Sequence, residues 1–179
     1  MFEAQRLYHV SEEDGIAVFE PRLPPSADSG VRGEVVWAID EEHLPNYLLP
    51  RDCPRVTFGV SEHTTGEDRD AHFGGSIGHR IVAIESAWVP RIRMCRLFIY
   101  EMPRDDFQLA DHSAGYCVAR KPVVPIAVTE VVDCLAEIEK CGAELRICEA
   151  LWPLYDAVVG STLDYSIVRM RNARPRSRG

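Results

Sequence analysis

Short apolar runs of strand length recur along the chain, and they constrain the fold more than any other feature. Each run is rich in β-branched or aromatic residues and is bounded by polar residues or proline. The runs cover residues 7–10, 35–39, 55–60, 81–84, 97–100, 116–119 and 144–148. Runs of this length and composition predict β-strands. Because 81–84 and 97–100 follow one another along the chain, we expect an antiparallel or mixed sheet.

Two segments carry the spacing or the end signals of helices. The apolar residues of 130–141 recur at helical spacing, and Gly142 supplies the left-handed residue that ends such a helix. Pro153 suits the first turn of a last helix over 153–159. Together with the strands, these helices predict an α+β fold with a mixed, mostly antiparallel split sheet and flanking helices.

A shorter helix is expected after the strand at 35–39. Asp40 is a good N-cap for a helix that begins at Glu41, and Pro50 stops it. His43 lies among acids near the start of this helix, where an exposed salt bridge is the simplest expectation.

After Gly160 the pattern fits two structures. Residues 165, 167 and 169 alternate as in a strand, whereas residues 158, 162, 165 and 168 form a helical stripe. We prefer the helix for this segment.

The length and the charge indicate one domain with a short basic end. A chain of 179 residues buries about 70% of its unfolded surface within one core. We expect one globular domain over 1–170 and a disordered tail over 171–179, because 169–179 holds five Arg and no acid. The net charge is −8, so the acidic body repels nucleic acid, and only the tail could contact a phosphate backbone.

Cysteine spacing and hydropathy place the protein among intracellular proteins. No apolar run approaches the roughly 20 residues of a membrane span, and the first residues lack the features of a signal peptide. The six Cys include no Cys-x-x-Cys pair, so we expect buried thiols and no metal site. These features predict a cytoplasmic protein without a membrane partner.

The first strand ends in residues that can carry chemistry. His9 follows two apolar residues near the strand end, and Ser11 adds an alcohol two positions later. Arg22, Arg51 and Arg55 add guanidinium groups, which suit bidentate contacts with phosphate or carboxylate. We expect a pocket with His9 as its catalytic residue, although a lone histidine that makes only structural hydrogen bonds is the simpler alternative.

Two tyrosines extend this candidate pocket. Tyr116 and Arg120 share one strand face by their even spacing, and they form a second candidate pair. Tyr47 could stack on a planar ring of a ligand, although an aromatic residue at helical spacing more often belongs to a core.

The N-terminal pattern resembles a known group of enzymes. The run Leu7–Ser11, then Ile16 and Phe19, then a strand at 35–39 that leads into a short helix resembles the opening of ADP-ribosyltransferase-like domains. These include the RNA 2'-phosphotransferases and several bacterial toxins. In that group a first-strand Tyr-His-x-Ser or Tyr-His-x-Thr motif places the His on the adenosine ribose of NAD, which implies this role for His9.

One departure from that group separates two hypotheses. Many ADP-ribosyltransferases carry a Glu at the start of a late strand, and the comparable segment 114–120 contains no acid. The first hypothesis is an ADP-ribosyl- or phosphotransferase with NAD, ADP-ribose or another phosphorylated ligand in the pocket. The second is a non-catalytic domain of the same fold that binds a small molecule or a protein.

The whole chain also resembles a bacterial family of unknown function. The residues that carry this resemblance are Trp152–Leu154 and Arg169–Ala173. The resemblance implies no activity.

Overall fold

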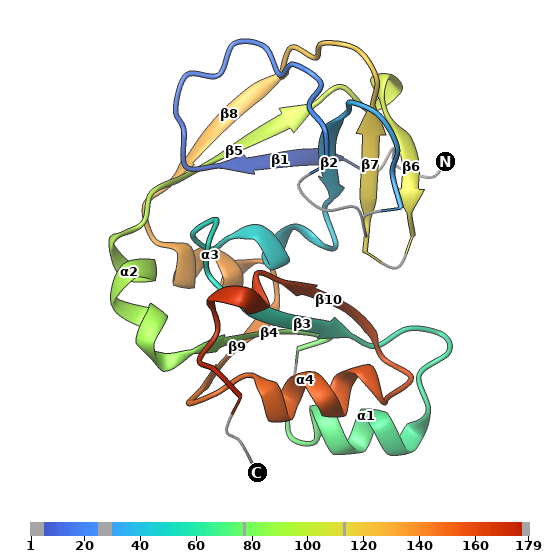
Figure 1. The fold of residues 1–179 in the computed structure, drawn as a ribbon, viewed down its shortest axis with the longest axis vertical. Coiled ribbons are helices and arrows are strands. Elements are labelled where there is room, and N and C mark those ends of the chain that lie inside the picture. Colours follow the sequence, from blue (N-terminus) through green and yellow to red (C-terminus); the bar gives the residue numbers. More distant parts are fainter. Residues whose placement is uncertain (1–5, 25–29, 77, 113, 177–179) are drawn as a thin grey trace. The chain divides into compact units, whose positions relative to one another are not determined.

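The computed structural model describes residues 6–24, 30–76, 78–112 and 114–176. Its contacts divide the chain into two compact units, unit 1 with residues 1–44 and 96–131 and unit 2 with residues 45–95 and 132–179. Both contain a β-sheet, and the helices are few (Figure 1). The predicted α+β class and the largely antiparallel pairing of its strands are confirmed.

Unit 1 is built on a six-stranded sheet in the order β6-β7-β2-β1-β5-β8, in which every neighbouring pair is antiparallel. The strands are β1 (Leu7–Ser11), β2 (Val36–Asp40), β5 (Leu97–Met102), β6 (Gln108–Asp111), β7 (Tyr116–Ala119) and β8 (Ala127–Val131). Alternate residues of the four inner strands form one apolar core with residues from the loops. That core contains Leu7, Phe19, Val36, Ala38, Tyr100, Met102, Phe107, Cys117, Ala119 and Val123.

The two edge strands of this sheet were not predicted. All four residues of β6 are exposed, and so are the first four of β8. An edge strand that exposes nearly all of its side chains leaves no continuous apolar run in the sequence. Because β8 continues to Val131, the helix predicted over 130–141 is shorter than expected and spans Cys134–Lys140 as α3.

Unit 2 contains a four-stranded sheet in the order β10-β3-β4-β9. Its strands are β3 (Arg55–Gly59), β4 (Arg80–Glu85), β9 (Ala143–Cys148) and β10 (Asp164–Val168), and only β4 and β9 pair in parallel. Its helices are α1 (Gly66–Phe73), α2 (Val89–Met94), α3 and α4 (Trp152–Val159). Every residue of β3 and β4 is buried. Helices α1 and α4 pack on one face of the sheet, in a core around Phe58, Phe73, Ile81 and Val158 (Figure 1).

The prediction of a helix after Gly160 is wrong, because residues 164–168 form the strand β10. It pairs antiparallel with β3, with Tyr165 opposite Phe58. Thr57 of β3 donates its hydroxyl to the carbonyl of Ser166 over 2.8 Å. The sequence of this segment fits the periodicity of a strand and that of a helix. Pairing with the distant strand β3 makes it a strand.

Helix α1 lies in a polar stretch that showed no helical pattern. Thr65 is its N-cap and accepts a hydrogen bond from the Asp68 backbone N–H over 3.2 Å. The Asp68 carboxylate accepts from the backbone N–H and the hydroxyl of Thr162, at 2.7 and 2.5 Å. These hydrogen bonds from Thr162 lower the pKa of Asp68. Helix α1 therefore depends on its cap and on contacts with the turn before β10.

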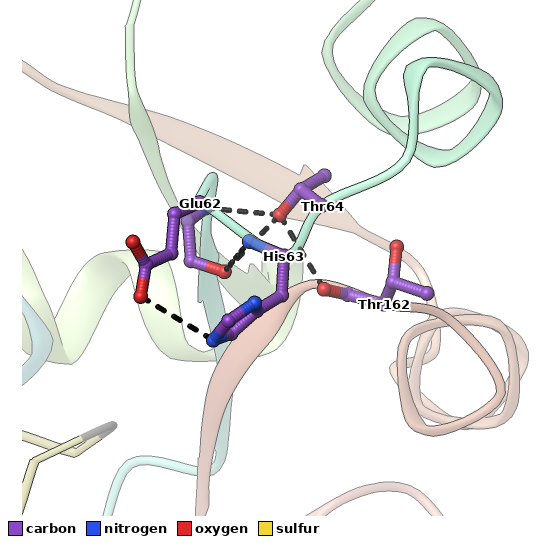
Figure 2. A network of polar contacts seen from close by, with 5 residues as sticks. Glu62, His63, Thr64 and Thr162 are labelled. Carbon is purple, nitrogen blue, oxygen red and sulfur yellow. Dashed lines mark hydrogen bonds and ion pairs between the residues drawn. The ribbon is translucent and has the colours of Figure 1, made fainter.

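The segment between β3 and α1 also contacts this turn, as Figure 2 shows. The Thr64 hydroxyl donates to the Thr162 carbonyl over 3.4 Å and accepts from the Ser61 backbone N–H over 2.9 Å. His63 makes a local ion pair with Glu62 at 3.4 Å, with both side chains largely exposed. The contacts join two segments that lie far apart in the sequence.

Most of the predicted basic tail has a described structure. The 3-10 turn η5 spans Met170–Asn172, and the backbone N–H of Arg174 donates to both carboxylate oxygens of Glu85, at 3.1 and 3.0 Å. Arg176 forms two hydrogen bonds with Asp156, and its guanidinium lies 4.3 Å from the ring centroid of Trp152. Residues 177–179 lie outside the described residues.

The helices of the described segments are too short or too polar to cross a lipid bilayer.

Candidate functional site

The inner strands of unit 1 separate close to His9. Among the described residues, strands β1 and β2 pair at Leu7 with Asp40 and at Tyr8 with Ile39. Beyond these pairs, β1 continues along β5 as far as Ser11, while β2 runs along β7. The β1–β2 ladder therefore ends between Tyr8 and His9, and we call this end of the ladder the strand split.

His9 spans the strand split with its side chain. Its Nδ1 lies 2.8 Å from the backbone carbonyl of Trp37 in β2. Because a carbonyl only accepts hydrogen bonds, Nδ1 carries a proton and donates it; for the neutral imidazole this is the tautomer in which Nε2 is the acceptor nitrogen. The side chain is half-buried, and its ring packs on Phe19 with centroids 4.7 Å apart. His9 thus has a defined tautomer and orientation.

The loop that follows β1 returns over the apolar face of the sheet. Phe19 exchanges two backbone hydrogen bonds with Val123, at 2.8 and 3.0 Å. The hydroxyl of Tyr100 donates to the carbonyl of Glu13 over 2.9 Å and accepts from the backbone N–H of Ile16 over 3.1 Å. These contacts hold the ring of Phe19 against His9.

An aromatic pair lies on β2 and β7, on the face of the sheet opposite to His9, because Val36, Ala38 and Cys117 share the core face with Leu7. The rings of Trp37 and Tyr116 meet edge to face with centroids 5.6 Å apart, and both side chains are half-buried. The sequence predicts Tyr116 as a site residue but neither Trp37 nor Phe19. Trp37 and Phe19 belong to the N-terminal pattern that resembles the ADP-ribosyltransferase-like domains. Their place in that pattern was the one sequence feature that could have pointed to them.

The polar residues predicted around His9 have separate partners in unit 1. The Ser11 hydroxyl accepts from the backbone N–H of Glu13 over 3.0 Å. Arg22 is exposed, and its backbone pairs with Val35. Arg120 lies one residue beyond the end of β7 and donates to the carbonyl of Arg32 over 2.9 Å, whereas Tyr116 contacts Trp37.

The other three predicted ligand-binding residues belong to unit 2. Arg55 is 3% exposed, donates to the carbonyls of Pro50 and Cys53, and has its guanidinium 5.3 Å from the ring centroid of Tyr47. Arg51 is exposed, and its carbonyl accepts from the Arg169 side chain over 3.4 Å. The structure brings Tyr47 and Arg55 together, and these contacts close the turn that precedes β3.

Glu85 and Glu101 lie at the ends of two other apolar runs and are the remaining candidates for the missing late-strand Glu. Glu85 is 3% exposed, and its carboxylate accepts from the backbone N–H groups of Leu151 and Arg174. Glu101 lies opposite Tyr8 in the β1–β5 ladder, whereas His9 lies opposite Tyr100. Since neighbouring residues of a strand point to opposite faces, Glu101 and His9 are on different faces of the sheet.

Comparison with known proteins identifies the family without an activity. Neither the curated proteins nor the solved structures gave a match. A family model described as a family of unknown function, DUF6886, matches residues 8–173 and so spans both units. The chain belongs to this family of unknown function.

Proposed function

We propose that unit 1 binds a nucleotide of the NAD or ADP-ribose type at the strand split and transfers an ADP-ribosyl or phosphoryl group from it. The observation that carries the proposal is the orientation of His9, whose Nδ1 donates to the Trp37 carbonyl where the β1–β2 ladder ends. In the neutral tautomer with the proton on Nδ1, Nε2 is the nitrogen that can accept, and we propose that it accepts from a ribose hydroxyl of the ligand. The resemblance of the first strand to ADP-ribosyltransferase-like domains assigns the same role to His9.

Unit 1 also contains an exposed cation of the kind that a phosphate requires. The ring of Phe19 packs on the imidazole of His9, whereas Trp37 and Tyr116 lie on the other face of the sheet and do not contribute to this site. Arg22 is exposed in the same unit and offers a cation for a phosphate. Group transfer at a ribose depends on positioning and on charge stabilisation, so it needs no protein nucleophile.

A second candidate function is binding without catalysis, on the same residues. It is favoured by β7, which reads Tyr-Cys-Val-Ala and has no acid at its start. In this case the ligand, a small molecule or a protein segment, binds at the strand split and no bond is broken.

A melting screen of the full chain tests for the ligand. The ligands are NAD, ADP-ribose, ATP and inorganic phosphate, each at a concentration far above its expected dissociation constant. A ligand at one hundred times that constant adds about 2.7 kcal/mol to the free energy of unfolding, which raises the melting temperature measurably. No shift with any of the four would overturn the nucleotide proposal.

Variants of His9 then test the site. We expect His9→Ala and His9→Gln to remove most of the ligand-induced shift, while His63→Ala, a change at an exposed histidine of unit 2, leaves it intact. A His9→Gln protein that folds and binds as the wild type would end the assignment of His9. Release of nicotinamide from NAD, or phosphoryl transfer, separates the enzyme from the non-catalytic alternative.

A further inference from the structure

The thiol of Cys134 lies beside Cys95 in unit 2. The Cys134 thiol donates to the backbone carbonyl of Cys95 over 3.8 Å. Burial raises the pKa of Cys134 to about 12, and contact with the Cys95 side chain raises it further. Cys134 is 1% exposed, whereas Cys95 is half-buried. Of the two residues, Cys95 is therefore the more accessible to a small reagent.

These two cysteines stand where the chain leaves unit 2 and where it returns. Cys95 caps the C-terminal end of α2 and is the last residue of unit 2 before the chain enters unit 1. The chain re-enters unit 2 at Val132, and Cys134 is the first residue of α3. The segment between the two cysteines contains β5, β6, β7 and β8.

We propose that Cys95 and Cys134 form an oxidisable thiol pair, which a hydroperoxide converts into an intramolecular disulfide. The peroxide transfers one oxygen to the sulfur of Cys95, which becomes a sulfenic acid, and the rest of the reagent leaves as water or an alcohol. The sulfur of Cys134 then attacks that of Cys95 and releases the oxygen as water. Two thiols are oxidised, one peroxide is reduced, and a thiol reductant reverses the reaction.

The disulfide would change the stability of the folded chain. It joins the exit and the return of the chain, so the second part of unit 1 becomes a closed covalent loop. Closing a loop lowers the conformational entropy of the unfolded chain. The oxidised protein is therefore expected to melt at a higher temperature than the reduced one.

Hydrogen peroxide and the full-length protein test the proposal. We expect the oxidised protein to lose two hydrogens in mass and to yield a tryptic species that links the peptide with Cys95 to the peptide with Cys134. We also expect the melting temperature to rise on oxidation and to return with dithiothreitol. The proposal is overturned if no linked species forms, or if Cys95 joins Cys53, whose thiol also interacts electrostatically with it.

Three single variants sharpen this test. Cys95→Ser and Cys134→Ser should each abolish the linked species and the gain in melting temperature. Cys141→Ser is the matched control, because Cys141 lies at the opposite end of α3, and it should behave as the wild type. Circular dichroism verifies that each variant is folded. An oxidised folded Cys134→Ser protein with the same gain in melting temperature would contradict the assignment.

Discussion

Nδ1 of His43 donates a hydrogen bond to Oδ1 of Asp40 over 2.7 Å, and both side chains are buried in unit 1. The same carboxylate oxygen accepts from the His43 backbone N–H over 2.9 Å. Gly115 lies against the pair, and its carbonyl accepts from the Asp40 backbone N–H over 3.1 Å. The prediction of an exposed salt bridge for His43 is wrong, because the side chain is buried.

The short helix expected after Asp40 is a 3-10 turn, η2 (Leu44–Tyr47).

Gly115→Ala is expected to destabilise unit 1 more than a glycine change with the same backbone strain. The φ of Gly115 is +68°, and a Cβ there would lie 2.3 Å from His43 Nδ1. The left-handed conformation costs about 1–2 kcal/mol for a residue with a side chain, and the steric clash adds about 1–3 kcal/mol. The measurement is the free energy of unfolding in urea.

Gly15→Ala is the matched control for this change. Its φ is +70°, and a Cβ at Gly15 would meet no described atom within 4 Å. Only the cost of the backbone conformation is expected there. Equal losses in the free energy of unfolding for the Gly15 and Gly115 variants would show that the steric clash with His43 does not contribute to the destabilisation.

Thr162→Val is expected to shift the acid titration of Asp68. The hydrogen bonds from Thr162 hold the pKa of Asp68 below its ordinary value. A carboxylate whose pKa is lower in the folded state stabilises the fold above its unfolded pKa, and this contribution is lost as the pH falls through the folded pKa. Valine removes the hydroxyl donor, so the folded pKa of Asp68 should rise and acid destabilisation should begin at a higher pH.

An NMR titration of the Asp68 carboxyl carbon and melting curves at several pH values measure this effect. Thr129→Val, a change on the exposed strand β8, is the control and should leave both curves unchanged. The same Asp68 midpoint in Thr162→Val and in the wild type would contradict the assigned role of Thr162.

Glu85→Ala is expected to release the C-terminal segment. The buried carboxylate accepts hydrogen bonds from the Leu151 N–H over 3.2 Å and from the Arg174 N–H. Alanine removes this acceptor from both donors. Loss of a buried acceptor costs about 1–3 kcal/mol of stability. Hydrogen exchange at the amide of Arg174 should become faster. Glu85→Gln keeps an acceptor oxygen and should retain slow exchange, so equal exchange in both variants would argue against this role of Glu85.

Phe58→Ala is expected to cost about 3–5 kcal/mol in the free energy of unfolding, as is usual for a buried aromatic side chain. Phe58 is 0% exposed and packs edge to face on Phe73, with centroids 5.5 Å apart. Tyr165 lies opposite Phe58 in the β3–β10 ladder but is 40% exposed, so Tyr165→Ala should cost far less. Chemical denaturation of the two variants measures the difference. Similar losses would contradict the position of Phe58 in the core.

The site could be predicted only in part from the sequence. The motif around His9 indicated a histidine close to a strand end, whereas His9 is the third of the five residues of β1, and the end beside it is that of the β1–β2 ladder. The carbonyl that orients His9 belongs to Trp37, which is distant in the sequence. Arg55 was expected to bind a phosphate, but its guanidinium donates to backbone carbonyls of the preceding turn. A residue type specifies what a side chain can bind, whereas the packed chain decides which partner it meets.

The sequence by itself determined the α+β class and the family. It also determined the interior strands such as β3 and β4, because strands that bury their side chains contain continuous apolar runs. Only the tertiary structure decided that 164–168 is a strand, that β6 and β8 exist, and where β1 leaves β2. These features depend on hydrogen bonds between residues far apart in the chain. Local periodicity records the burial of a segment, but it holds no information about which distant backbone completes its ladder.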